Sequence, residues 1–253
     1  MKKAISLLLS FVIAFSVITP AIPGLDFATI EAEAATGSNS AYATLFTTSD
    51  LQVNDYYKQM ETMMSYAVDD GYGAPDAFLF GGDFQTSSNA EESITHHMDN
   101  MERLFNKFFP YYHTENLVFI KGNHDARDER HYETGLYEFD NFMVYVINED
   151  DYRAGNLNDA KTASENLKIA MDRLLTSGND KPVFVMTHVP FHHNSRGEYG
   201  QSAYGRYLFD VLNQYGNYMD IIFLFGHNHS DTYDDYIGGS VNYLGVGDTI
   251  YIS

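Results

Sequence analysis

The stretch LVFIKGNHD, residues 117–125, holds the pattern from which the fold can be predicted. Its first half is a short apolar run, which is typical of a strand covered on both faces in a parallel α/β sheet. Asn123, His124 and Asp125 follow where the run ends, and their side chains bind metals or transfer protons. Ligands of open α/β sheets bind beyond the carboxyl ends of the strands. The stretch therefore predicts a buried strand with an active site at its end.

The same pattern, an apolar run followed by Asp, Asn or His, occurs four more times. The other runs end in Thr48-Ser49-Asp50, Gly81-Gly82-Asp83, Thr187-His188 and Gly226-His227-Asn228-His229. Five expected strands thus deliver polar side chains to one edge of the fold. Together these side chains could hold two metal ions.

The segments between these motifs carry apolar residues at helical or strand spacing. We expect helices at 55–68, 90–109, 158–175 and 204–215, and strands at 41–47, 77–80, 117–121, 142–147, 182–186 and 221–225. Residues 238–253 are rich in β-forming residues. There is no internal repeat, low-complexity tract or proline-rich linker, so residues 41–253 are expected to form one catalytic α/β domain. Because the sequence stops in a strand-like run, we expect this domain to be truncated at its C-terminus.

The amino-acid composition indicates a globular protein and argues against a nucleic-acid partner. Hydrophobic residues make up 44 % of the 253 residues and aromatic residues 15 %, which argues for a globular protein with a substantial core. Lys and Arg number 15 against 35 Asp and Glu, a formal charge of −20. Such a surface repels nucleic-acid backbones and anionic membranes at long range, so no nucleic-acid partner is expected.

The N-terminus has the features of a secretory signal peptide. A Met-Lys-Lys start precedes an apolar run at 4–18, and Ala32-Glu33-Ala34 supplies an Ala-x-Ala cleavage site before Ala35. The run is shorter than the roughly 20 residues needed to span a bilayer, which disfavours a membrane anchor. We therefore expect residues 1–34 to be a cleaved signal peptide and 35–40 a flexible leader. The mature protein would then be secreted or held at the cell surface, without stable membrane insertion.

Cysteine is absent, which limits both cross-linking and metal binding. Neither disulfides nor thiolate ligands are available, so any metal must be held by carboxylate, amide and imidazole groups. Donors of this kind suit Mn, Fe, Zn, Ni or Co better than Cu(I) or an iron–sulfur cluster.

In order and spacing, the five motifs resemble those of the calcineurin-like metallophosphoesterase superfamily, over residues 41 to about 252. The resemblance implies an α/β fold, a four-layer α/β/β/α sandwich with two mixed sheets and the metal site at the C-terminal strand ends. It also implies a pair of divalent or trivalent metal ions and a small phosphate-ester substrate. The identity of the metals and the oligomeric state stay open.

The resemblance also implies a role for each site residue. Asp83 would bridge two metals, Asp50 and His229 would complete one site, and Asn123, His188 and His227 would complete the other. His124 would be the general acid beside the metals and not a ligand. Either Asp50 or Asp125 could orient its ring, and the sequence does not decide between them.

The chemistry of phosphate-ester hydrolysis fits these roles. The reaction requires neutralisation of charge on the phosphate oxygens, an activated water in line with the leaving group, and a proton for the departing alkoxide. Two divalent ions about 4 Å apart supply the first two, because a hydroxide that bridges them is available near neutral pH. A histidine side chain has a reference pKa of about 6.5 and can supply this proton, which is the role expected for His124.

The sequence departs from the superfamily at one ligand. Its members commonly have Asp-x-His where this chain has Asp50-Leu51-Gln52. The Gln52 carbonyl oxygen is a weaker donor than imidazole, so we expect one tightly held and one exchangeable ion. The alternative interpretation is a surface module that binds metal without turnover.

The second departure concerns the substrate. Protein serine/threonine phosphatases of the superfamily continue the second motif with an acidic residue and Arg, but here Asp83 is followed by Phe-Gln-Thr-Ser. This favours small phosphomonoesters, phosphodiesters or nucleotides over phosphoproteins.

Overall fold

The computed structural model gives the fold of most of the chain. It describes residues 29–30, 43–51, 56–70, 73–85, 91–110, 116–148, 150–153, 157–190, 205–227, 231–234, 241–246 and 249–252. The helices are α1 (Tyr56–Asp69), α2 (Glu91–Phe108), α3 (Asp150–Arg153), α4 (Leu157–Ser177) and α5 (Gly205–Tyr215). The strands are β1 (Thr29–Ile30), β2 (Leu45–Thr48), β3 (Ala77–Phe80), β4 (Leu117–Phe119), β5 (Gly135–Glu138), β6 (Met143–Val146), β7 (Val183–Thr187), β8 (Ile221–Phe225), β9 (Asp231–Asp234), β10 (Val241–Val246) and β11 (Thr249–Ile252).

The strands form two sheets. The first has the order β1-β11-β2-β3-β4 and the second β5-β6-β7-β8-β10-β9. Strands β2, β3 and β4 run parallel, as do β6, β7, β8 and β10. Both sheets are mixed, because β11 is antiparallel to β2, β5 to β6 and β9 to β10.

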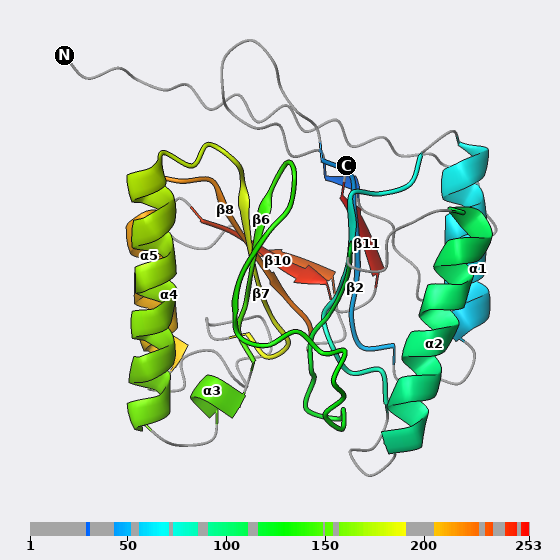
Figure 1. The fold of residues 1–253 in the computed structure, drawn as a ribbon, viewed down its shortest axis with the longest axis horizontal. Coiled ribbons are helices and arrows are strands. Elements are labelled where there is room, and N and C mark those ends of the chain that lie inside the picture. Colours follow the sequence, from blue (N-terminus) through cyan, green and yellow to red (C-terminus); the bar gives the residue numbers. More distant parts are fainter. Residues whose placement is uncertain are drawn as a thin grey trace.

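Figure 1 shows the two sheets facing each other, with α1 and α2 over the outer face of the first and α4 and α5 over the outer face of the second. This is the expected α/β/β/α sandwich. Three clusters of buried side chains separate the four layers, one beneath each helical layer and one between the sheets.

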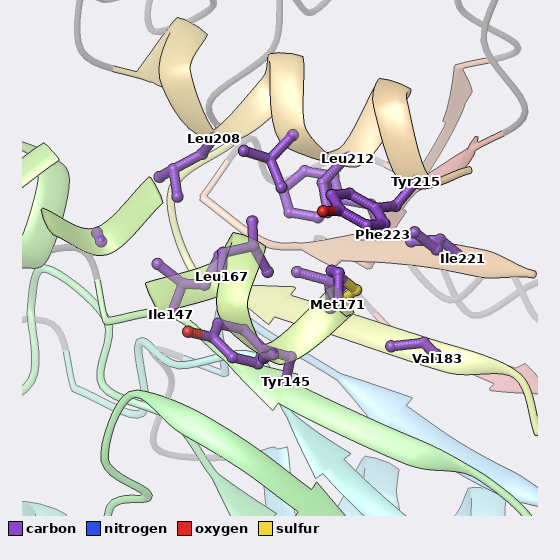
Figure 2. Close-up of a cluster of buried hydrophobic side chains, with 14 of the residues drawn as sticks. Tyr145, Ile147, Leu167, Met171, Val183, Leu208, Leu212, Tyr215, Ile221 and Phe223 are labelled. Carbon is purple, nitrogen blue, oxygen red and sulfur yellow. The ribbon is translucent and has the colours of Figure 1, made fainter. Parts of the chain in front are cut away.

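Side chains of each central strand alternate between two apolar clusters. In β3, Phe78 and Phe80 pack beneath α1 and α2, whereas Ala77 and Leu79 lie between the sheets. Because both faces are covered, the strand has to be apolar at every position, which is why its sequence is an unbroken apolar run. Figure 2 shows the matching layer of the second sheet, where Met171 of α4 and Leu212 of α5 lie over Phe223 of β8.

One part of the predicted signal peptide lies among the described residues. Strand β1 lies within the segment 1–34 that the sequence predicts to be removed, and it pairs with β11. Among the described residues, no helix is long and apolar enough to cross a membrane.

Candidate metal centre

The polar residues that follow the apolar runs come together at one edge of the two sheets. Asp50 follows β2, Asp83 follows β3 and Asn123 follows β4, while His188 and His227 follow β7 and β8 of the other sheet. Side-chain contacts join all five, as the next paragraphs describe. The carboxyl ends of parallel strands from both sheets therefore build one site, as expected for this class of fold.

Three ligand types surround a common point. His188 Nε2 lies 3.1 Å from Asp83 Oδ2 and 3.1 Å from Asn123 Oδ1. His227 Nδ1 lies 2.7 Å from the same Asn123 oxygen. Ligand atoms of Asp83, His188 and His227 all lie within 4.8 Å of one another. Imidazole, carboxylate and amide donors at this spacing fit a divalent transition metal.

Asp50 joins the same site through the backbone of the last motif. Its Oδ2 accepts a hydrogen bond of 2.8 Å from the His227 amide, across a sequence separation of 177 residues. The Asp50 side chain is buried, so its carboxyl group is held away from bulk water and close to the other donors. This position suits the predicted role of Asp50 as a metal ligand.

Three of these residues have an unusual backbone conformation. Asp50, Asp83 and His227 have φ values of 57°, 58° and 70°, and within the described part of the chain no other non-glycine residue has positive φ. The left-handed conformation costs a side-chain-bearing residue about 1–3 kcal/mol and is typical of functional sites. Here it turns the chain sharply at the strand end.

Glycines allow the loops to approach closely. A Cβ placed on Gly122 would lie 2.2 Å from Asp83 Oδ1, and one on Gly226 would lie 1.9 Å from Ser49 Oγ and 2.7 Å from Asp50 Oδ2. The buried Ser49 hydroxyl in turn donates to the Gly81 carbonyl over 3.1 Å. Sequence reasoning did not identify Ser49; its only signal there is the position next to Asp50.

His188 is oriented by the backbone. Its Nδ1 lies 2.7 Å from the Gly81 carbonyl oxygen, so Nδ1 carries a proton and Nε2 faces Asp83 and Asn123. Burial opposes the charged form, but the hydrogen bond to Asp83 and the charges of Asp50 and Asp83 raise the pKa of His188 to about 10. The carboxylates thus create a strong demand for positive charge at Nε2. A metal cation would satisfy that demand in place of the proton.

The two carboxylates differ in how they hold their charge. Burial is the largest influence on Asp50 and raises its pKa. Burial also acts on Asp83, but the hydrogen bond and charge of His188 outweigh it and lower the pKa. Buried acids that share one pocket require a compensating cation. The residues present therefore fit a metal centre.

Asp125 contacts backbone amides. Its two oxygens accept hydrogen bonds from the amides of Gly122, Asp83, Phe84 and Gln85. Burial raises its pKa to about 6, against the opposing effect of these hydrogen bonds. The carboxylate thus binds the loops together, and orientation of the His124 ring by Asp50 or Asp125 stays a prediction.

The remaining predicted residues divide into two groups. His124 is half-buried, and its amide donates to Asp83 Oδ1 over 2.8 Å, which places it beside the ligand cluster. Gln52 and His229 lie outside the described residues, so their roles as ligands of the second ion stay predictions.

A family model described as calcineurin-like phosphoesterase matches residues 44–231 of the sequence. The chain belongs to the calcineurin-like phosphoesterase family. That range runs from the start of β2 to β9, and so includes every motif of the site. Members of this family are hydrolases that depend on two metal ions, in agreement with the donor set at the strand ends.

Solved structures share the fold at low sequence identity. A dimetal phosphatase from Danio rerio aligns with a TM-score of 0.53 and 10 % identity, over 80 % of this chain and 86 % of the other. A purple acid phosphatase from yellow lupin (Lupinus luteus) seeds aligns with a TM-score of 0.53 and 12 % identity, over 83 % of this chain and 44 % of the other. No curated protein matches this chain. The two phosphatases thus share the fold with this chain although their sequences differ at most positions.

Proposed function

We propose that the protein hydrolyses small phosphate mono- or diesters with two metal ions and uses His124 as general acid. The observation that carries this proposal is the convergence of Asp83, Asn123, His188 and His227 at one edge of two sheets. Asn123, Asp83, His188 and His227 would hold one ion, and Asp50, Asp83, His229 and Gln52 the other. Bound there, the ions would neutralise phosphate charge and activate a water molecule for attack.

His124 performs the proton transfer in this scheme. Its amide donates a hydrogen bond to Asp83 Oδ1, so the residue is held next to the carboxylate that would bind both ions. When the bond between phosphorus and the leaving oxygen breaks, the protonated imidazole gives its proton to that oxygen. A fixed backbone limits the positions open to the ring, which is how position would contribute to rate.

The sequence that follows Asp83 supports a small substrate. Phe84 is a core residue, with its ring centroid 5.3 Å from that of Phe80 and 5.7 Å from that of Phe119. The motif continues with Gln-Thr-Ser and lacks the acidic residue and Arg that phosphoprotein phosphatases of the superfamily carry in its extension. This favours small phosphate esters.

The deciding experiment compares the parent with His124→Ala on chromogenic phosphomonoesters and phosphodiesters, with Mn, Zn, Ni or Mg added. We expect metal-dependent turnover that falls about 10²–10⁴-fold in the variant, the usual contribution of a general acid. His96→Ala is the matched control, because His96 is exposed on α2 and contacts Asn100. Bound metal without turnover in the parent would favour the non-catalytic metal-binding module instead.

The retention of the second ion shows how strongly Gln52 affects metal binding. We propose that it exchanges, because an amide oxygen binds more weakly than imidazole. Dialysis against chelator should leave one metal equivalent in the parent and two in Gln52→His. Two equivalents in the dialysed parent would contradict this.

We also propose export, with cleavage before Ala35. The support is the basic start, the short apolar run and the Ala-x-Ala site. Mass spectrometry of protein collected outside expressing cells should give an N-terminus at Ala35. Retention of residues 1–34 on the protein would disprove the cleavage.

A further inference from the structure

We propose that Asp125 is a positioning residue whose carboxylate locks together the two loops of the metal centre and thereby sets its affinity for metal ions. The inference rests on the proposed function, since it concerns the same site. Asp125 would act through Asp83 and through Asn123 and His124, and not by contact with the substrate.

The hydrogen bonds of Asp125 connect two segments about forty residues apart in sequence. Oδ2 accepts from the Asp83 amide over 2.7 Å and from the Gly122 amide over 3.0 Å. Oδ1 accepts from the amides of Phe84 and Gln85 over 2.8 and 3.2 Å. The side chain is 2 % exposed, so water does not compete for these bonds. Four amide donors saturate both oxygens of the carboxylate.

The conformation that creates this contact also positions a metal ligand. Successive amides converge on an anion when one residue of a turn is left-handed. Gly82 and Asp83 have φ values of 90° and 58°, and the three amides that follow Gly82 all reach Asp125. The turn therefore binds the Asp125 carboxylate with its backbone while it presents the Asp83 side chain to the metals.

A second set of contacts runs in the opposite direction. Asp83 Oδ1 accepts the His124 amide over 2.8 Å. Gly122 packs so closely that a Cβ there would lie 2.3 Å from the Asp83 nitrogen. Each loop thus donates amides to a carboxylate of the other. Loss of the Asp125 carboxylate would remove its four hydrogen bonds, while the bond between the His124 amide and Asp83 would remain. The turn at Asp83 would then be less firmly held.

Asp125→Asn is the sharpest variant, because it keeps the volume of the side chain. The amide has one oxygen for accepting, and its NH₂ group would face backbone N–H donors. Replacement of a residue that orients a metal ligand without contacting the metal typically lowers metal affinity 10–100-fold. We expect a loss of that size in Asp125→Asn.

Asp76→Asn is the matched control. Asp76 Oδ2 also accepts a backbone amide, that of Thr44 over 2.7 Å, but it lies before β3, at the opposite end of that strand from Asp83. Both variants should lower the thermal unfolding temperature of the metal-free protein. Only Asp125→Asn should weaken Mn²⁺ binding.

The experiment titrates Mn²⁺ into metal-free parent, Asp125→Asn and Asp76→Asn by calorimetry. A 10–100-fold weaker Kd in Asp125→Asn alone supports the proposal, as does recovery of its turnover at saturating Mn²⁺. Parent-like affinity in Asp125→Asn overturns it and leaves the proposed function intact, whereas a parent that binds no Mn²⁺ overturns both. If Asp125→Asn does not fold, Asp125→Glu serves instead. Glutamate keeps the negative charge, but its extra methylene moves the carboxylate away from the four amides. Parent-like affinity in Asp125→Glu would likewise overturn the proposal.

Discussion

Single residues at the metal centre have almost no alternative positions. Asp50, Asp83 and His227 adopt the left-handed backbone conformation, and glycines lie where loops touch. Each of these features costs stability locally, and the packed sheets beneath must compensate. Small changes of side-chain volume at this edge should therefore affect both stability and activity.

Gly226→Ala tests this directly. The new methyl would lie 1.9 Å from Ser49 Oγ, so the Ser49 and Asp50 side chains have to move. We expect a loss of about 1–3 kcal/mol in the free energy of unfolding, together with a large loss of turnover. Urea denaturation and phosphatase assays measure the two effects.

Gly135→Ala is the control for that experiment. A Cβ on Gly135 of β5 has nothing within 4 Å, so the free energy of unfolding should stay within about 0.5 kcal/mol of the parent. Equal effects of the two substitutions would show that crowding at Gly226 is not the cause.

His131 should make the fold sensitive to acid. Burial, together with nearby Lys and Arg side chains, lowers the pKa of His131 to about 4 from an ordinary 6.5. Between these values the unfolded chain binds a proton that the folded chain does not. Stability that is present above pH 6.5 is therefore lost as the pH falls toward 4, by at most about 3 kcal/mol from this group.

The comparison with His131→Gln isolates this contribution. Nδ1 of His131 accepts the Asp128 amide over 3.1 Å, a bond that the glutamine oxygen can replace. The difference in unfolding free energy between parent and variant should shift in favour of the variant as the pH falls from 6.5 to 4. A difference that does not change with pH would contradict the prediction.

The gathering of the candidate site residues could be predicted from the sequence pattern. Polar residues directly after unbroken apolar runs predicted that Asp83, Asn123, His188 and His227 lie together, because the carboxyl ends of parallel strands meet at one edge of a sheet. The amide contacts of Asp125 could not be predicted, since they depend on the turn at Asp83. That turn is a three-dimensional property of two loops and leaves no periodic signal.

At the scale of elements, unbroken apolar runs and strong helical periodicity gave accurate bounds, whereas a segment with neither signal was not predicted. The expected strands at 77–80 and 221–225 coincide with β3 and β8, and the expected helix at 158–175 differs from α4 by two residues or fewer at each end. The expected first strand at 41–47 is β2, Leu45–Thr48. Strand β5 was missed, because its residues are only partly buried and do not alternate.

Helix α4 illustrates how an element is held by one face. Met171 is fully buried in the cluster beneath α4 and α5, and Ile169 on the same helix is 51 % exposed. Met171→Ala should lower the free energy of unfolding by about 2–5 kcal/mol, because it leaves a cavity between helix and sheet. Ile169→Ala should change it by less than about 0.5 kcal/mol. Chemical denaturation of both variants checks the contrast, and comparable losses would contradict this packing.

At the scale of the whole molecule, the geometry of the candidate metal centre depends on how the two sheets are placed relative to each other. Asp50, Asp83 and Asn123 come from the first sheet, and His188 and His227 from the second. The cluster between the sheets, which includes Leu79 of β3 and Phe184 of β7, fixes the distance between these two groups. The apolar runs predicted buried strands with polar residues at their ends, whereas the division of these strands between two sheets was expected only from the resemblance to the superfamily.

The place of β11 beside β2 has a consequence for how the protein is made. These two strands pair across a long sequence separation, since Thr48 lies opposite Thr249. While the polypeptide leaves a ribosome or a secretion channel, the edge of β2 that pairs with β11 therefore stays unpaired until residues 249–252 have emerged. Unpaired strand edges promote aggregation, so a chaperone that binds the N-terminal segments during synthesis should raise the yield of native protein.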